Sequence, residues 1–280
     1  MLPWRTEDHS SARPVDLGNL PARREGRALK RWRYVGVFGP ERMLCVGLAH
    51  VGGVPQAWWA VWDRGAGSLR ERTIFARPRA IVRFGHGPGR VTVRDRDVRI
   101  DLELDEGRGV ETVCPHGGGT GWIWTRKQAG IAARGSVRLG ERAFAVDGLA
   151  VVDDTAGYHA RHTAWRWSAG VGRTADGQVA GWNLVSGVND PPHDSERTVW
   201  LDGAPREAGP CTFADDLSAV RTADGGDLAF RAEATRERHD ELLLVRSDYR
   251  QPFGTFSGVL PGGAGLAEGF GVMEDHRARW

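Results

Sequence analysis

The chain has 280 residues, of which 40% are hydrophobic and 26% charged, with a formal net charge of +2. This composition is typical of a globular protein with a buried core, and the scattered basic residues lack the clustering of a nucleic-acid-binding surface. No apolar run could form a membrane-spanning helix, and the charged N-terminus does not look like a signal peptide, so we expect a cytoplasmic protein.

The first half of the chain alternates polar and apolar residues, the pattern of half-buried β-strands. Between residues 98 and 105, for example, Val98, Ile100, Leu102 and Leu104 share one face and charged residues the other. Further short strands are predicted at 31–39, 41–51, 57–65, 70–78, 89–97 and 109–115, each bounded by Gly, Pro or Asp. Helix is expected only as one or two turns within 11–31 and within 212–220.

The second half repeats this style, with strands predicted at 142–154, 163–172, 177–188, 196–203 and 226–247 and a Gly-rich segment from Phe253 onward. Many short strands separated by turn signals predict an all-β sandwich or barrel architecture. The best candidate boundary lies near residues 147–157, which gives two predicted domains, 1–150 and 151–280.

The twelve tryptophans cluster in a few strands, and the most concentrated stretch is residues 153–172. In a strand, Arg161, Thr163, Trp165 and Trp167 point to one face, which would suit a ligand with an apolar body and a polar group. The alternative is an ordinary core strand whose Arg161 reaches a carboxylate at the rim.

Three more residues are candidate ligand contacts. In the strand predicted around residues 122–127, Trp124 lies on one face and Lys127 on the other, and Lys127 is one of only two lysines. Lys127 could bind an anion or donate a proton, or it could be a surface residue. Asn183 could fix a polar atom of a ligand, although amides also form local bonds to the backbone.

Metal and serine-hydrolase sites are not supported. His159 and His162 are three residues apart and would lie on opposite faces of a strand, so they do not converge on one ion. No G-x-S-x-G motif occurs, so the nucleophile elbow of an esterase is missing. We expect no metal and no cofactor.

Five motifs together resemble one protein family. They are W-T-R-K from Trp124, D-x-T-x-G-Y-x-x-R-x-T-x-W-x-W from Asp153, G-W-N-L-x-x-G-V-N from Gly181, Q-P-F-G-x-F-x-G from Gln251 and G-V-M-E-D-H-x-A-R-W from Gly271. The combination resembles the family called domain of unknown function 2804, over about Trp32 to Trp280. That family is distantly similar to a lipocalin-like group of carotenoid hydratases, tocopherol cyclase and Diels–Alderases.

The resemblance implies two lipocalin-like antiparallel β domains packed together, with a site for a small hydrophobic or amphipathic molecule. By analogy, the protein would be a cofactor-independent hydratase, cyclase or isomerase working by acid–base catalysis. Asp154, Glu274 or Asp275 would supply the acid, Tyr158 or His276 would relay the proton, and Trp165 and Trp167 would form the walls. One alternative is a non-catalytic carrier or sensor of a lipid-like compound. Another is an assembly partner in which the tryptophans only fill the core.

The last ten residues, GVMEDHRARW, separate the candidate catalytic residues into two groups. In an extended strand Glu274, His276 and Trp280 share one face, whereas Asp275 points the other way. We therefore expect Glu274 and His276 to act as a pair at a pocket and Asp275 to pair with a nearby arginine. Trp280 is expected to dock this strand into the fold.

Overall fold

The computed structural model describes residues 1–85, 89–118, 121–242 and 245–280. Its helix is the single turn α1 (Pro78–Ile81), and the remaining elements in these ranges are strands, so the prediction of an all-β fold is confirmed. No helix in the described ranges is long and apolar enough to cross a membrane.

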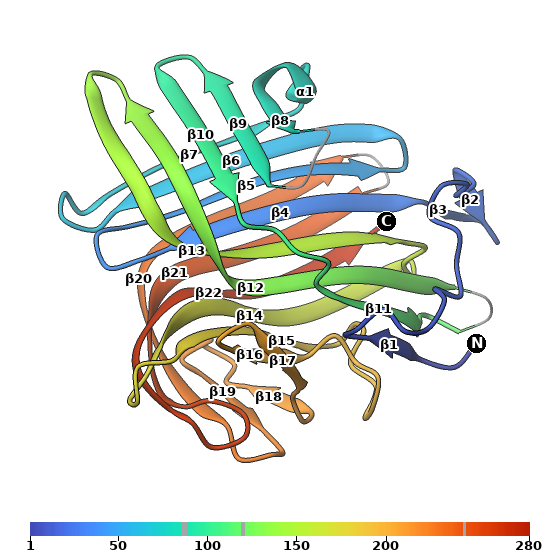
Figure 1. The fold of residues 1–280 in the computed structure, drawn as a ribbon. Helices are drawn as coiled ribbons and strands as arrows, with labels where there is room; N and C mark the ends of the chain where they lie inside the picture. Colours follow the sequence, from blue (N-terminus) through green and yellow to red (C-terminus); the bar gives the residue numbers. More distant parts are fainter. Residues whose placement is uncertain (86–88, 119–120, 243–244) are drawn as a thin grey trace.

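Apart from one small hairpin, the strands before residue 158 form the first sheet, and all its pairings are antiparallel (Figure 1). Its order is β7-β6-β5-β4-β13-β12-β10-β9-β8, and β11 pairs with both β1 and β12. The bounds are β1 (Trp4–Thr6), β4 (Lys30–Phe38), β5 (Arg42–Val51), β6 (Val54–Asp63), β7 (Ser68–Ile74), β8 (Val82–Phe84), β9 (Arg90–Asp95), β10 (Val98–Leu104), β11 (Val110–Pro115), β12 (Trp122–Leu139) and β13 (Arg142–Gly157). A separate small hairpin joins β2 (Arg23–Arg24) and β3 (Arg27–Ala28).

The second sheet has the order β17-β16-β15-β14-β22-β21-β20-β19-β18. The bounds are β14 (His162–Thr174), β15 (Val179–Ser186), β16 (Thr198–Leu201), β17 (Ala204–Glu207), β18 (Cys211–Phe213), β19 (Ala219–Thr222), β20 (Asp227–Leu242), β21 (Val245–Val259) and β22 (Gly265–Arg279). The chain passes from one sheet to the other between Gly157 and His162. The division into domains at residues 150 and 151 stays a prediction.

The three largest apolar cores lie within and between the two sheets. One lies within the first sheet and another within the second, because each sheet curls toward itself. The third is shared, and includes Tyr34 and Phe38 of β4 together with Trp167 of β14 and Phe253 of β21. Figure 1 shows the long strands of both sheets lying beside one another at this shared core.

A glycine in the longest strand permits this curvature. The pairing of β12 with β13 shifts register between Ala129 and Ile131, where Gly130 has a φ of 77°. Such a left-handed residue is easiest for glycine, and the resulting β-bulge bends the strand. The two halves of β12 therefore pair with different neighbours, β11 before the bulge and β10 after it.

The two predicted helical turns are wrong. Residues 11–31 form bends and the β2–β3 hairpin, because Pro14, Gly18, Pro21 and Gly26 interrupt any helical run. Their apolar side chains pack instead against Trp122 and the neighbouring buried residues. Residues 212–220 form the end of β18, a turn and the start of β19.

Candidate functional site

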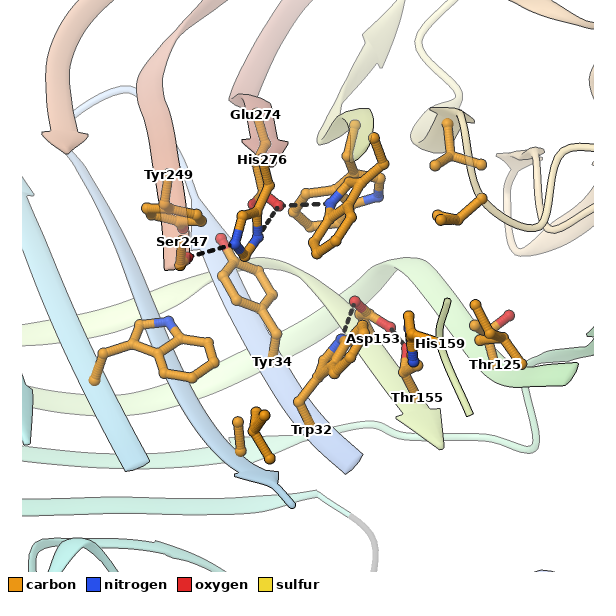
Figure 2. A pocket seen from close by; sticks show the side chains of 18 of the residues that line it. Trp32, Tyr34, Thr125, Asp153, Thr155, His159, Ser247, Tyr249, Glu274 and His276 are labelled. Atoms are coloured by element: carbon orange, nitrogen blue, oxygen red, sulfur yellow. Dashed lines mark hydrogen bonds and ion pairs between the residues drawn. The ribbon is translucent and has the colours of Figure 1, made fainter. Parts of the chain in front are cut away.

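A cavity of about 150 Å³ lies between the inner faces of the two sheets, and Figure 2 shows its walls. Strand alternation places one side chain in two from each strand toward this space. The cavity is therefore built from rows of residues that are neighbours across the strands of each sheet.

Two such rows form the wall from the first sheet. One runs Lys127, Asp153, Tyr34, Gly47, Trp58 and Thr73, across β12, β13, β4, β5, β6 and β7. The other runs Thr125, Thr155, Trp32, Ala49 and Gln56. Every member of both rows except Gly47 lines the cavity.

Matching rows form the wall from the second sheet. Trp165 of β14 lies opposite His276 of β22, which lies opposite Tyr249 of β21. Trp167 lies opposite Glu274 in the next row. The two walls meet through aromatic contacts, because Trp32 stacks on Trp165 with ring centroids 6.3 Å apart.

Glu274 is the principal acid in this space. Its side chain is buried, and its two oxygens accept hydrogen bonds from Trp165 Nε1 and Gln251 Nε2, both at 2.8 Å. Removal from water disfavours the charged form and raises the pKa of Glu274 to about 7, although these two hydrogen bonds oppose the shift. Glu274 can therefore hold or release a proton near neutral pH.

His276 lies beside Glu274 and has the opposite shift. Burial lowers the pKa of His276 to about 4, so its ring is neutral at pH 7. Nδ1 lies 3.9 Å from Glu274 Oε1, and Nε2 shares a hydrogen bond of 2.8 Å with Ser247 Oγ. Figure 2 shows Glu274, His276, Ser247 and Tyr249 grouped at one end of the cavity, with Tyr34 reaching toward them from the first sheet.

The other end holds a buried ionic group around Lys127. Lys127 Nζ lies 2.7 Å from Asp153 Oδ1 and 3.2 Å from Glu196 Oε1, and these carboxylates keep the pKa of Lys127 raised despite its burial. Burial raises the pKa of Glu196, which favours its neutral form. Trp32 contacts both ends of the cavity. Its ring stacks on Trp165, and its Nε1 donates to Asp153 Oδ2 at 3.1 Å.

Five of the ten predicted site residues line the cavity: Lys127, Trp165, Trp167, Glu274 and His276. Asn183 lies behind the wall, where Oδ1 accepts a hydrogen bond from Trp167 Nε1 at 2.7 Å. Arg161 is exposed and does not line the cavity. Asp275, as expected, points away, with Oδ2 at 3.4 Å from Arg166 Nε.

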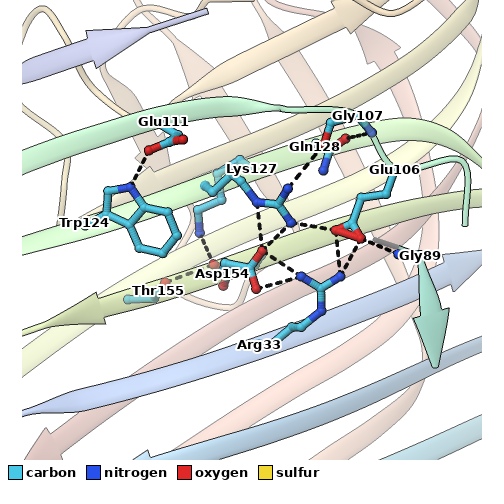
Figure 3. Close-up of polar contacts among 12 residues, drawn as sticks. Arg33, Gly89, Glu106, Gly107, Glu111, Trp124, Lys127, Gln128, Asp154 and Thr155 are labelled. Atoms are coloured by element: carbon cyan, nitrogen blue, oxygen red, sulfur yellow. Dashed lines mark hydrogen bonds and ion pairs between the residues drawn. The ribbon is translucent and has the colours of Figure 1, made fainter. Parts of the chain in front are cut away.

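The other three predicted residues belong to the structural framework. Asp154 pairs with Arg33 at 2.8 Å and Arg126 at 2.7 Å, on the opposite face of β13 from the cavity (Figure 3). Trp124 donates its indole hydrogen to Glu111 at 2.8 Å, also seen in Figure 3. The Tyr158 hydroxyl donates to the Pro21 carbonyl oxygen at 2.8 Å.

Several lining residues were not among the predicted site residues, chiefly Trp32, Tyr34, Trp58 and Tyr249. Trp32 and Tyr34 are two apart in the predicted strand 31–39, so alternation alone places them on one face. The missing information was which face of that strand meets the second sheet.

Comparison with known structures supports the same fold. An AttH-type protein of Nitrosomonas europaea is 16% identical, with a TM-score of 0.51, and the match covers 94% of this chain and 98% of that one. Kievitone hydratase from Nectria haematococca is 10% identical, with a TM-score of 0.50, over 88% of each chain. These likenesses confirm the predicted lipocalin-like fold.

Comparison with the sequences of curated proteins gave no significant match. The family model described as domain of unknown function (DUF2804) matches residues 112–280, which include the Lys127 group and the Glu274–His276 strand. The chain therefore belongs to the DUF2804 family, as its motifs predicted.

Proposed function

We propose that the protein binds a small apolar or amphipathic compound in this cavity and transfers a proton to it from Glu274, as a cofactor-independent hydratase, cyclase or isomerase. The observation that carries the proposal is the environment of Glu274, a buried carboxyl with a pKa of about 7 beside Trp165 and His276. General acids work best when their pKa lies near the working pH. One structural neighbour with the same fold is a hydratase, which is support by analogy only.

For a hydration, the steps divide among these residues. Glu274 donates its proton to one carbon of a double bond, and positive charge develops on the other carbon, against the faces of Trp32 and Trp165. Water then attacks that carbon. His276 accepts the released proton, helped by the new negative charge on Glu274 3.9 Å away, and returns it to Glu274. The net change is the addition of one water.

Isotope uptake tests this proposal. Compounds extracted from the purified protein are returned to ligand-free protein in deuterated, ¹⁸O-labelled water and followed by mass spectrometry. We expect the wild type to incorporate deuterium, and ¹⁸O if the reaction is a hydration, and Glu274→Gln to be slower by about 100-fold or more. Asp275→Asn is the matched control, because that neighbouring carboxylate points away from the cavity.

Uptake at the wild-type rate in Glu274→Gln would overturn the catalytic role of Glu274. A wild-type protein that rebinds the extracted compound without any isotope uptake would instead be a carrier.

A further inference from the structure

The charges that face the cavity are already compensated within the protein. Lys127 pairs with Asp153, Arg236 Nε lies 2.6 Å from Glu71 Oε2, and Arg238 Nε lies 2.6 Å from Asp240 Oδ2. Among the described lining residues, no lysine or arginine lacks a carboxylate partner. A ligand carboxylate or phosphate would therefore enter without a free cation to bind it.

The remaining titratable groups shift toward their neutral forms. Burial raises the pKa of Glu196 and Glu274, and it lowers the pKa of His159 and His276. Shifts in this direction show that the cavity solvates charge poorly, so burying an ionic ligand there would be costly. Polar recognition in the cavity must come from neutral hydrogen-bonding groups.

Two such groups lie on the wall from the first sheet. The Tyr34 hydroxyl and Trp58 Nε1 are buried without a well-oriented hydrogen-bond partner, apart from the weakly bonding thiol of Cys45, which is within reach of the Tyr34 hydroxyl. The two residues flank Gly47 in one row, and the Trp58 ring fills the space above that glycine. Both groups can donate a hydrogen bond, so this part of the wall suits a ligand oxygen that accepts one.

The Lys127 end offers the complementary group. The Asn189 side chain is 4% exposed, and its Nδ2 donates to Glu196 Oε2 at 3.2 Å, which leaves Oδ1 buried without a partner. Asn189 has a φ of 47°, a left-handed conformation that asparagine tolerates better than most residues. Its Oδ1 can only accept, so it suits a hydroxyl of the ligand.

From this arrangement, we infer that the ligand is an uncharged molecule with an aromatic or alicyclic body, a carbonyl or ether oxygen at the Tyr34–Trp58 corner and a hydroxyl that donates to Asn189. Lys127 and Tyr34 are two strands apart, roughly 10 Å, so a ring with a short chain spans the distance. The inference rests on the cavity being the ligand site of the proposed function, and it adds the ligand's chemical class and orientation.

The test uses five probes on one frame, each titrated into the wild-type protein by calorimetry. The parent probe is a para-hydroxyphenyl alkyl ketone. The other four lack the hydroxyl, lack the carbonyl, carry a carboxylate in place of the ketone, or carry a primary amine there. We expect the parent to bind best, and each deletion to weaken binding about five- to tenfold. The carboxylate and the amine should bind at least as weakly as the deletion probes.

Variants assign each contact. Trp58→Phe removes the indole N–H together with part of the ring, so it should weaken every probe somewhat and should weaken the parent about fivefold more than the probe without a carbonyl. Asn189→Gly keeps the backbone conformation accessible, and it should weaken the parent but not the probe without a hydroxyl. Trp59→Phe is the control, because that indole lies on the other face of β6 and donates to Asp95.

Tighter binding of the carboxylate or the amine than of the parent would overturn the inference, as would equal affinities across the series or no binding of any probe. Catalysis is separate: the expected probe series together with no isotope uptake would leave the ligand class standing and remove the proposed reaction.

Discussion

Burial shifts the pKa values of the neighbouring side chains Glu274 and His276 in opposite directions, and this gives them opposite roles in proton transfer. Both lie on the cavity face of β22, and both prefer the uncharged state there. For a carboxyl the uncharged state carries a proton, and for an imidazole it lacks one. The pair therefore holds a proton donor and a proton acceptor side by side at pH 7.

These shifts predict opposite pH dependences of stability. Glu274 binds its proton more tightly when folded, so its contribution to the free energy of unfolding falls as pH rises from 4.5 to about 7. His276 binds its proton more weakly when folded, so its contribution grows as pH rises from about 4 to 6.5. Each change amounts to about 3 kcal/mol at most.

Urea unfolding of Glu274→Gln and His276→Gln at a series of pH values measures this. Relative to wild type, Glu274→Gln should gain stability as pH rises through its window, and His276→Gln should lose it. A flat difference would show that the side chain concerned keeps its ordinary pKa, and two differences of the same sign would contradict the predicted direction for one of the pair.

For single residues, sequence reasoning identified the strands that line the cavity but could not tell which face of each strand points into it. Asp154, Trp124 and Tyr158 each have an immediate neighbour on the cavity wall, namely Asp153, Thr125 and His159. A shift of one residue moves a strand's whole side-chain set to the other face, and nothing in one sequence says which face meets the second sheet. Glu274 and His276 kept their shared face because they are two residues apart.

The strands themselves follow from alternating residues and turn signals, but their partners do not. β4 pairs with β13 across more than a hundred residues, and this pairing is what brings Tyr34 beside Asp153. Local patterns carry no information about such distant contacts. The row that contains Tyr34 and Trp58 was therefore visible only in the structure.

Gly47 of β5 lies between Tyr34 and Trp58 in that row, and we expect its substitution to destabilise the protein. A Cβ on Gly47 would lie 2.1 Å from the Trp58 ring, so Gly47→Ala must push the indole out of the cavity wall. We expect a loss of about 2 kcal/mol in the free energy of unfolding, and weaker binding of any cavity ligand. Denaturant unfolding and probe calorimetry measure the two effects.

Gly148→Ala is the matched control, because its added Cβ would meet its nearest neighbour at 3.6 Å, an ordinary contact. If both alanine variants behave alike, Trp58 does not depend on Gly47 for its position.

Across the whole molecule, Trp280 ties the last strand of the second sheet to the first. Its Nε1 donates to Thr163 Oγ1 at 3.1 Å, and Lys30 Nζ of β4 lies 4.8 Å from its ring centroid. Trp280→Ala should lower stability by about 2 kcal/mol, and Tm by roughly 4–6 °C. Trp280→Phe keeps a ring above Lys30 and should lose less. An unchanged Tm in the alanine variant would refute this docking.

The central claim is that the space between the two sheets holds a small apolar or amphipathic molecule. Native mass spectrometry of the purified protein tests it most directly, with Trp165→Ala compared with wild type and Trp59→Phe as the control. We predict a bound compound on the wild type and on Trp59→Phe, and its loss from Trp165→Ala. A wild-type protein without bound mass, or a mass that Trp165→Ala retains in full, would contradict the account.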